Sequence, residues 1–138
     1  MRKRRLLKNR SHYHVIAKIN RGEMILEENQ IKSLFLEVVK NAKKKYKFKI
    51  SNYCLMDNHV HILLKPLKKE NLSKIMQWIL SVFAIRYNKM FKLKGHVWYD
   101  RFKSKIIDKV NHFIDAFRYI TNNPVKAELV SKPKRLSF

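Results

Sequence analysis

The chain has 138 residues, of which 46% are apolar, so it is long enough for one domain with one hydrophobic core. Its single cysteine, Cys54, excludes a disulfide framework and a cysteine-based zinc site, and no apolar run approaches the roughly 20 residues of a membrane span. Lys and Arg number 32 against 10 Asp and Glu, a formal net charge of +22. We therefore expect a cytoplasmic, nucleoid-associated protein whose partner is nucleic acid and not a membrane.

The first part of the chain predicts an arm, a strand and a helix. Residues 1–10 are basic and should stay loose until they meet phosphate, whereas residues 11–138 make up the single domain. Residues 12–19 alternate between apolar and polar, which is typical of a half-buried strand. Apolar residues recur at helical spacing from about 29 to 46, which predicts an amphipathic helix.

Two strands and a long helix are expected next. Residues 48–55 and 58–65 read as strands, and the turn between them is short enough for a hairpin. Asn71 is placed to cap a helix whose apolar residues continue to Met90, and Gly95 interrupts the chain after it.

The last part of the chain completes a recognisable order of elements. Residues 96–108 look extended, and a helix is expected from about 109 to 122, ended by Pro124. The order strand, helix, strand, strand, helix, strand, helix predicts an α+β fold, the ferredoxin-like split βαβ arrangement, with an added C-terminal helix. Two helices would cover one face of the antiparallel sheet and leave the other face free.

Two histidines, His59 and His61, lie one residue apart in the third predicted strand. Because side chains alternate along a strand, both imidazoles share a face, about 7 Å apart, while the neighbouring aliphatic residues pack beneath the helices. The pair fits two ligands of one cation, but two solvated polar side chains are the more common meaning of this spacing taken alone. His12 and His14 have the same spacing, and we interpret them as surface or substrate-contact residues.

The final predicted helix carries a tyrosine beside its apolar stripe. The stripe consists of Val110, Phe113, Ile114, Phe117 and Ile120. Tyr119 lies off it, one turn before Asn123. A tyrosine hydroxyl with a pKa near 10 attacks a phosphodiester poorly unless a cation polarises the phosphate. The histidine pair and the amide oxygen of Asn123 could hold such a cation. The alternatives are a surface tyrosine and an asparagine that only ends the helix.

Five blocks in order resemble the HUH-type single-tyrosine transposases, in which two histidines flank a hydrophobic residue, and most closely the REP-associated tyrosine transposases of the IS200-like group. The blocks are YHV (13–15), YCLMDNHVHILLKP (53–66), NLSKIMQWI (71–79), GHVWYDRFKSKII (95–107) and FRYITNNPVKAELV (117–130).

The resemblance implies metal-dependent cleavage of single-stranded DNA near a hairpin or palindromic repeat. His59 and His61 match the paired metal ligands, and Asn123 matches the polar residue that completes the site for Mg²⁺ or Mn²⁺. Tyr119 matches the nucleophile, which becomes linked to DNA as a 5′-phosphotyrosine and releases a 3′-hydroxyl. That hydroxyl, or another, later attacks the linkage and rejoins the strand.

Basic and aromatic residues late in the chain are candidates for DNA contact. They are Trp98, Arg101, Lys103, Lys105 and Arg118. Alternating basic residues of an extended segment can point together toward phosphates, and Trp98 either stacks on an unpaired base or belongs to the core. Relatives in the wider family are monomers or homodimers with shared active sites, and we favour the homodimer. The alternative to an enzyme is a catalytically silent module that binds DNA or RNA hairpins.

Overall fold

The computed structural model describes residues 11–128, with side chains as far as Asn122. The predicted basic arm, residues 1–10, lies outside the described residues, as does the segment 129–138. The elements are β1 (His12–Lys18), a 3₁₀ turn (Asn20–Gly22), α1 (Asn29–Lys45), β2 (Phe48–Leu55), β3 (His59–Pro66), α2 (Leu72–Phe91), β4 (Lys103–Ile107) and α3 (Val110–Glu128). This order confirms the predicted α+β arrangement.

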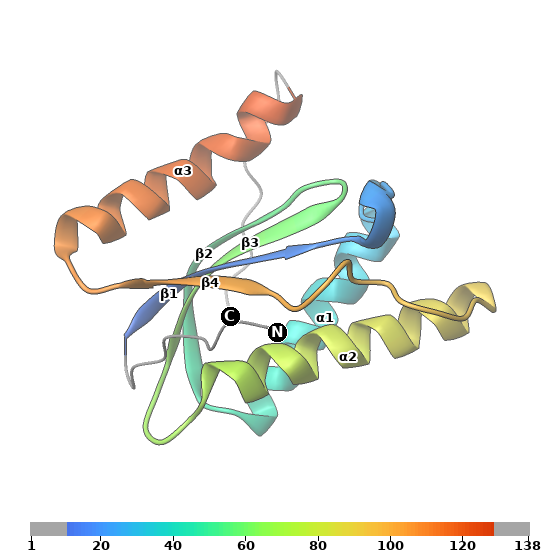
Figure 1. Ribbon diagram of the computed structural model, residues 1–138, viewed down its shortest axis with the longest axis horizontal. Coiled ribbons are helices and arrows are strands. Elements are labelled where there is room, and N and C mark those ends of the chain that lie inside the picture. Colours follow the sequence, from blue (N-terminus) through green and yellow to red (C-terminus); the bar gives the residue numbers. More distant parts are fainter. Residues whose placement is uncertain (1–10, 129–138) are drawn as a thin grey trace.

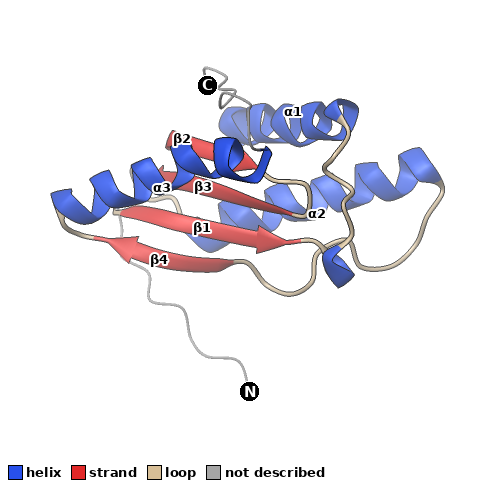
Figure 2. Cartoon of the chain, turned by 90° about the horizontal axis from the view of Figure 1, so that it is seen from above, coloured by secondary structure: helices blue, strands red, loops and turns tan. Residues whose placement is uncertain are grey.

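The four strands form one antiparallel sheet in the order β2-β3-β1-β4. Helices α1 and α2 lie on one face of this sheet, and α3 crosses the opposite face (Figure 1). Viewed from above, α3 runs over the strands on the side away from α1 and α2 (Figure 2), and it packs mainly on β2. From the sequence we expected the second face to be free, and this expectation was wrong, because α3 covers part of that face (Figure 2).

The face beneath α1 and α2 holds the main hydrophobic core. Alternate residues of β1 and β3 point into it, including Val15 and Ile62, whose exposed fractions are close to zero. The rings of Phe35 on α1 and Phe83 on α2 meet edge to face, with 5.5 Å between their centroids. Buried aromatic pairs contribute packing beyond the area that they bury. The packing of this layer therefore stabilises the sheet, whose other face carries α3.

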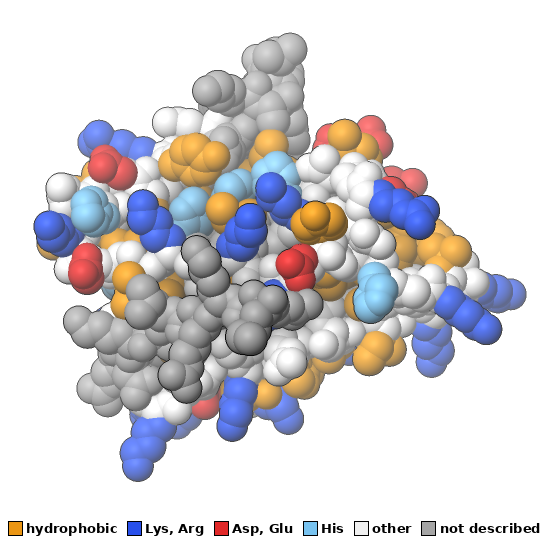
Figure 3. Space-filling view, in the orientation of Figure 1, with side chains coloured by type: hydrophobic (Ala, Val, Ile, Leu, Met, Phe, Trp, Pro, Cys, Tyr) orange, Lys and Arg blue, Asp and Glu red, His pale blue; other side chains and the backbone are white. Residues whose placement is uncertain are grey.

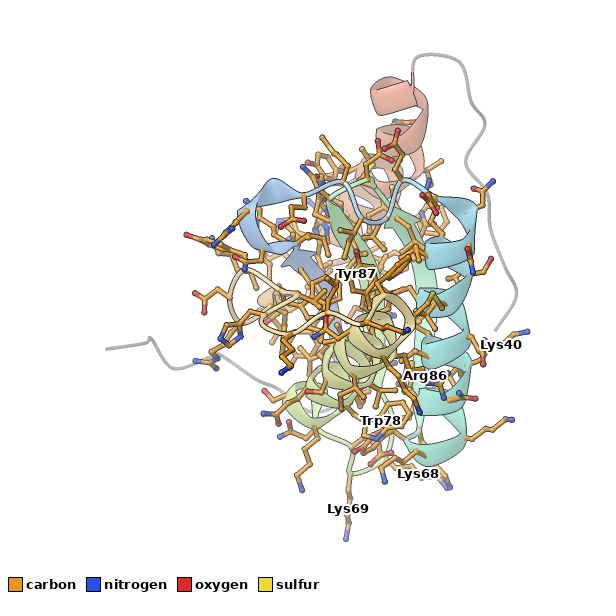
Figure 4. All side chains as sticks on the ribbon, turned by 90° about the vertical axis from the view of Figure 1, so that its right-hand side faces the viewer. Lys40, Lys68, Lys69, Trp78, Arg86 and Tyr87 are labelled. Atoms are coloured by element: carbon orange, nitrogen blue, oxygen red, sulfur yellow. The ribbon has the colours of Figure 1, made fainter. Side chains whose placement is uncertain are left out.

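Helix α2 begins as the sequence predicts. The side chain of Asn71 accepts a hydrogen bond from the Lys74 backbone N–H over 3.2 Å, which satisfies one of the free donors of the first turn. Figure 4 shows Trp78, Arg86 and Tyr87 along the helix. The Arg86 guanidinium lies 3.3 Å from a carboxylate oxygen of Glu37 on α1, so an exposed ion pair joins the two helices at their outer surface.

The predicted extended segment 96–108 is shorter in the structure, since only Lys103–Ile107 pairs as a strand besides an isolated bridge at Trp98. The indole N–H of Trp98 donates to the carbonyl oxygen of Leu80 over 2.9 Å, and its ring lies 5.5 Å from that of Phe83. Core packing of this aromatic side chain therefore holds the segment as a loop along α2.

The predicted end of the last helix was wrong, because α3 continues past Pro124 to Glu128. Proline lacks one backbone N–H and normally disfavours the interior of a helix, but its fixed φ is close to the helical value. The loss of one hydrogen bond does not end a helix whose preceding turns are docked on a sheet.

The side of α3 that packs on the sheet also differs from the predicted stripe. Val110 is 78% exposed and Ile114 is also exposed, so these two residues lie away from the sheet. A second, smaller cluster docks the helix instead. It consists of Cys54, Leu63, Ile107 and Ile120, with Met56, Phe113, Ala116 and Phe117 packed against it.

No helix within residues 11–128 is both long and apolar enough to cross a membrane.

Candidate active site

The histidine pair lies on the sheet face that α3 crosses. In the antiparallel register His61 is opposite Ile16 of β1 and His59 is opposite Lys18, and paired residues point to the same face. His61 is 3% exposed, whereas His59 is partly exposed at the start of β3. Figure 3 shows histidine side chains gathered along this face with Lys and Arg beside them.

A third histidine from β1 completes the group. The Nε2 atom of His14 lies 3.0 Å from the Nδ1 atom of His61, which is hydrogen-bond distance between two rings. The His59 and His61 ring centroids are 4.9 Å apart. From the sequence we interpreted His14 as a surface or substrate-contact residue and did not assign it to the metal site. Its spacing from His12 was the available signal, but its contact with His61 depends on β1 lying next to β3.

Tyr119 comes to this group from α3. Its ring centroid lies 5.5 Å from that of His61 and 5.9 Å from that of His14, in edge-on orientation to both. The side chain is 54% exposed. The structure thus brings His59, His61 and Tyr119 together within one chain, whereas from the sequence we favoured a homodimer with shared sites.

A buried asparagine fixes the height of α3 above the sheet near Tyr119. The amide of Asn52 donates to the Phe117 carbonyl oxygen over 3.0 Å and to the Thr121 hydroxyl over 2.7 Å. Its side-chain oxygen accepts from the backbone N–H of Tyr53 over 2.9 Å. The two helix partners of Asn52 lie two residues before and two residues after Tyr119. Asn52 therefore holds the turn that presents the tyrosine, a role that nothing in the sequence pattern indicated.

The imidazoles are held neutral at physiological pH. Burial, followed by the nearby positive charge of Lys105, lowers the pKa of His14, and burial with Lys18 lowers the pKa of His59. Burial is also the largest cause for His61, whose pKa falls to about 3 because His14, His59 and Lys18 add to the effect. Neutral imidazole is the form that binds a metal ion.

Two hollows flank Tyr119. One, of about 770 Å³, is lined by Lys18, Arg21, His59 and His61, and by the exposed ring of Tyr99. The other, of about 380 Å³, also borders Tyr119 and is lined by residues of β1, β4 and α3, among them Lys105. An extended strand that occupied both hollows would pass the tyrosine at the point where they meet.

The candidate DNA-contact residues fall into two groups. Lys105 is opposite His14 and Lys103 is opposite Ile16, so both exposed lysines share the face of the histidines. Arg118 is exposed on α3. Arg101 and Trp98 instead line a groove of about 700 Å³ between α2 and the loop that precedes β4. The contacts of Trp98 with Leu80 and Phe83 agree with the alternative that this side chain belongs to the core.

The imidazoles of His59 and His61 suit a cation that accepts nitrogen ligands. The third expected ligand is missing from the described side chains. Among those residues, no three His, Cys, Asp or Glu side chains are arranged to hold a metal ion. The predicted third ligand is an amide, and the side chain of Asn123 lies outside the described residues, although its backbone belongs to α3. In both His59 and His61 the hydrogen bond engages Nδ1, which leaves Nε2 for a ligand bond.

One known protein family matches most of the chain. The model of the family described as "Transposase IS200 like" matches residues 8–123. The chain belongs to the IS200-like transposase family. This membership makes it a DNA-processing protein of the transposase class. No curated protein matches the chain.

Two solved structures share the fold of this IS200-like transposase. One is described as a REP-associated tyrosine transposase bound to a REP hairpin; it has a TM-score of 0.79 and 20% identity, over 94% of this chain and 76% of that one. The other, from Deinococcus radiodurans R1 and assigned as a transposase, has a TM-score of 0.61 and 16% identity, over 88% of this chain and 97% of that one. At these identities the similarity concerns the fold.

Proposed function

We propose that this transposase cleaves and rejoins single-stranded DNA through a covalent bond to Tyr119, with a divalent cation, Mg²⁺ or Mn²⁺, at His59 and His61. The observation that carries the proposal is the edge-on approach of the Tyr119 ring to His61, 5.5 Å between centroids, at the junction of two hollows. The solved relative that binds a REP hairpin supports a hairpin-flanked substrate.

The reaction balances without an external energy source. The Tyr119 hydroxyl oxygen attacks the phosphorus, the bond from phosphorus to the 3′ oxygen breaks, and the phenol proton leaves while the departing 3′ oxygen gains one. A 3′-hydroxyl then attacks the phosphotyrosine, which restores the phosphodiester and the free tyrosine. The cation would supply charge neutralisation at the phosphate.

The chain's own residues prepare this step. His59 and His61, with the amide of Asn123 as the proposed third group, would hold the cation, and Asn52 positions the turn of α3 that carries Tyr119. Lys18, Lys103 and Lys105 project from the same sheet face and would bind phosphates on either side of the cleaved bond. Exposed Tyr99 could stack on an unpaired base in the larger hollow.

A labelled single-stranded oligonucleotide with a hairpin, incubated with Mn²⁺ and run on a denaturing gel, tests the proposal. We expect the wild type to form a covalent adduct and Tyr119→Phe to form none while still binding the hairpin. Tyr87→Phe, on the opposite side of the sheet (Figure 4), is the matched control and should form the adduct. A wild type that binds the hairpin without ever forming an adduct would support the silent binding module instead.

We further propose that Tyr119 works with the histidines of its own chain, because the Asn52 contacts hold α3 on its own sheet. This arrangement departs from the shared sites that we favoured from the sequence, while the homodimer itself stays a prediction. Mixing Tyr119→Phe with a His59→Ala/His61→Ala variant distinguishes the two arrangements. Restored adduct formation would show a shared site, whereas two inactive proteins that stay inactive together support the proposal.

A further inference from the structure

The two histidines of the proposed metal site are tied down at the same ring atom. The Nδ1 atom of His59 lies 2.8 Å from the Oδ1 atom of Asn58, and the Nδ1 atom of His61 lies 3.0 Å from the Nε2 atom of His14. Neither contact engages Nε2. The protonation of each ring, and hence its capacity to bind a cation, therefore depends on what its Nδ1 partner can accept.

For His59 the neighbouring backbone determines which ring nitrogen carries the proton. The amide nitrogen of Asn58 donates to the carbonyl oxygen of Gly22 over 3.4 Å, and a carbonyl oxygen can only accept. This contact turns the amide oxygen of Asn58 toward His59, so Nδ1 of that ring must carry the proton. Its Nε2 atom then has a free lone pair.

For His61 the partner is another imidazole, which can donate or accept. If His14 donated from Nε2, the Nε2 atom of His61 would carry a proton and could not bind a cation. If His14 accepts, His61 has the same proton arrangement as His59. His14 itself is a poor candidate for a ligand through Nε2, since that atom faces His61.

We propose that His14 is a positioning residue that accepts a hydrogen bond from His61 Nδ1–H and thereby, with Asn58, presents both Nε2 lone pairs to one divalent cation. The inference rests on the metal site of the proposed function. Partners behind metal-bound histidines commonly fix the ring orientation and raise ligand basicity, and their loss typically weakens metal affinity by about 10- to 100-fold.

Mn²⁺ titration of the DNA-free protein, followed by the electron paramagnetic resonance signal of the free ion, measures the predicted effect. His14→Phe should weaken Mn²⁺ binding by about 10- to 100-fold. His14→Gln, whose amide oxygen can accept, should recover most of the affinity. His12→Phe is the matched control, because His12 lies on the same face of β1 but packs on Phe113, 4.7 Å between ring centroids. It should bind Mn²⁺ like the wild type.

The position of the proton can be read without metal or activity. Nitrogen-15 spectra of the imidazoles in the metal-free protein should show His61 protonated at Nδ1 in the wild type and in His14→Gln. His14→Phe should shift His61 toward the Nε2–H form. A wild-type His61 protonated at Nε2, or a His14→Phe variant that binds Mn²⁺ as tightly as His12→Phe, would overturn the inference.

Failure of the inference and failure of the proposed function give different results. If His59→Ala and His61→Ala bind Mn²⁺ like the wild type, the metal site itself is wrong and the role of His14 falls with it. If these two variants lose Mn²⁺ while His14→Phe keeps it, the site stands and only the positioning role is wrong.

Discussion

The two faces of the sheet differ in what their side chains do. The face under α1 and α2 is packed with large apolar residues such as Phe35 and Phe83. The face under α3 has a small apolar cluster at one side and, next to it, three histidines and several lysines around Tyr119. One face supplies stability, and the other can therefore tolerate buried polar groups and like charges that a functional site requires.

The largest expected contrast in stability comes from a truncation in the main core. Phe83→Ala should lower the free energy of unfolding by about 3–5 kcal/mol, because it removes a fully buried ring and leaves a cavity. Ile85→Ala, on the same helix but 66% exposed, should change it by less than about 0.5 kcal/mol. Urea unfolding measures both, and equal losses would contradict the assignment of stability to the packed core under α1 and α2.

A smaller effect is expected from the polar contact that docks α3. Asn52→Ala should cost about 1–3 kcal/mol, since it removes the partners of the Phe117 carbonyl and the Thr121 hydroxyl. Hydrogen exchange should quicken in α3 but not in α1, and adduct formation should fall while hairpin binding persists.

Asn111→Ala, at an exposed position of α3, is the control and should leave exchange and adduct formation unchanged. Uniformly faster exchange in both helices of Asn52→Ala would mean that the residue stabilises the whole fold and has no special part in placing the tyrosine.

Lowering the pH should destabilise the folded protein through the buried imidazole of His61. The unfolded chain takes up a proton at His61 below about pH 6.5, whereas the folded chain, in which its pKa is about 3, does not do so until much lower pH. The free energy of unfolding is therefore unaffected by protonation of His61 above about pH 6.5. Between pH 6.5 and pH 3 it falls by about 1.4 kcal/mol for each unit by which the pH is lowered.

Urea unfolding of the metal-free protein across this range tests the sign. His61→Gln should flatten the loss, because the neutral amide does not titrate, and His112→Gln, at an exposed position of α3, should leave it unchanged. A His61→Gln profile parallel to the wild type would contradict the assignment.

The smallest expected effect concerns the lysines. The double variant Lys103→Ala/Lys105→Ala should reduce the slope of log affinity against log salt for single-stranded DNA by about 1.4, or about 0.7 for each phosphate that is no longer neutralised. Lys40→Ala/Lys69→Ala removes the same charge from residues on the other side of the molecule (Figure 4) and should leave the slope nearly unchanged. Equal effects would mean that net charge alone governs binding.

Much of the fold could be predicted because its signals are local. The alternation of β1 and the cap at Asn71 depend only on neighbours in sequence, and the structure confirms them. The docked side of α3 could not be predicted in the same way. Exposed Ile114 and packed Ala116 both fit an amphipathic helix, and the choice between them depends on Cys54 and Leu63, which are distant in sequence.

The residues of the candidate site likewise fall into those that local sequence signals predicted and those that they did not. Alternation within one strand placed His59 and His61 together, and the family pattern added Tyr119. His14 and Asn52 act through contacts between elements, so their parts emerged only once the strand order and the position of α3 were known.

The outer strands of the sheet bear on how two copies of the chain could meet. β4 has only five residues and carries exposed Lys103 and Lys105, and β2 has an irregular register between Ile50 and Asn52. Short, charged or irregular strands are poor templates for the addition of another strand. The described edges of the sheet thus disfavour edge-to-edge pairing, so we expect a second copy to associate less readily through these strands than through other surfaces.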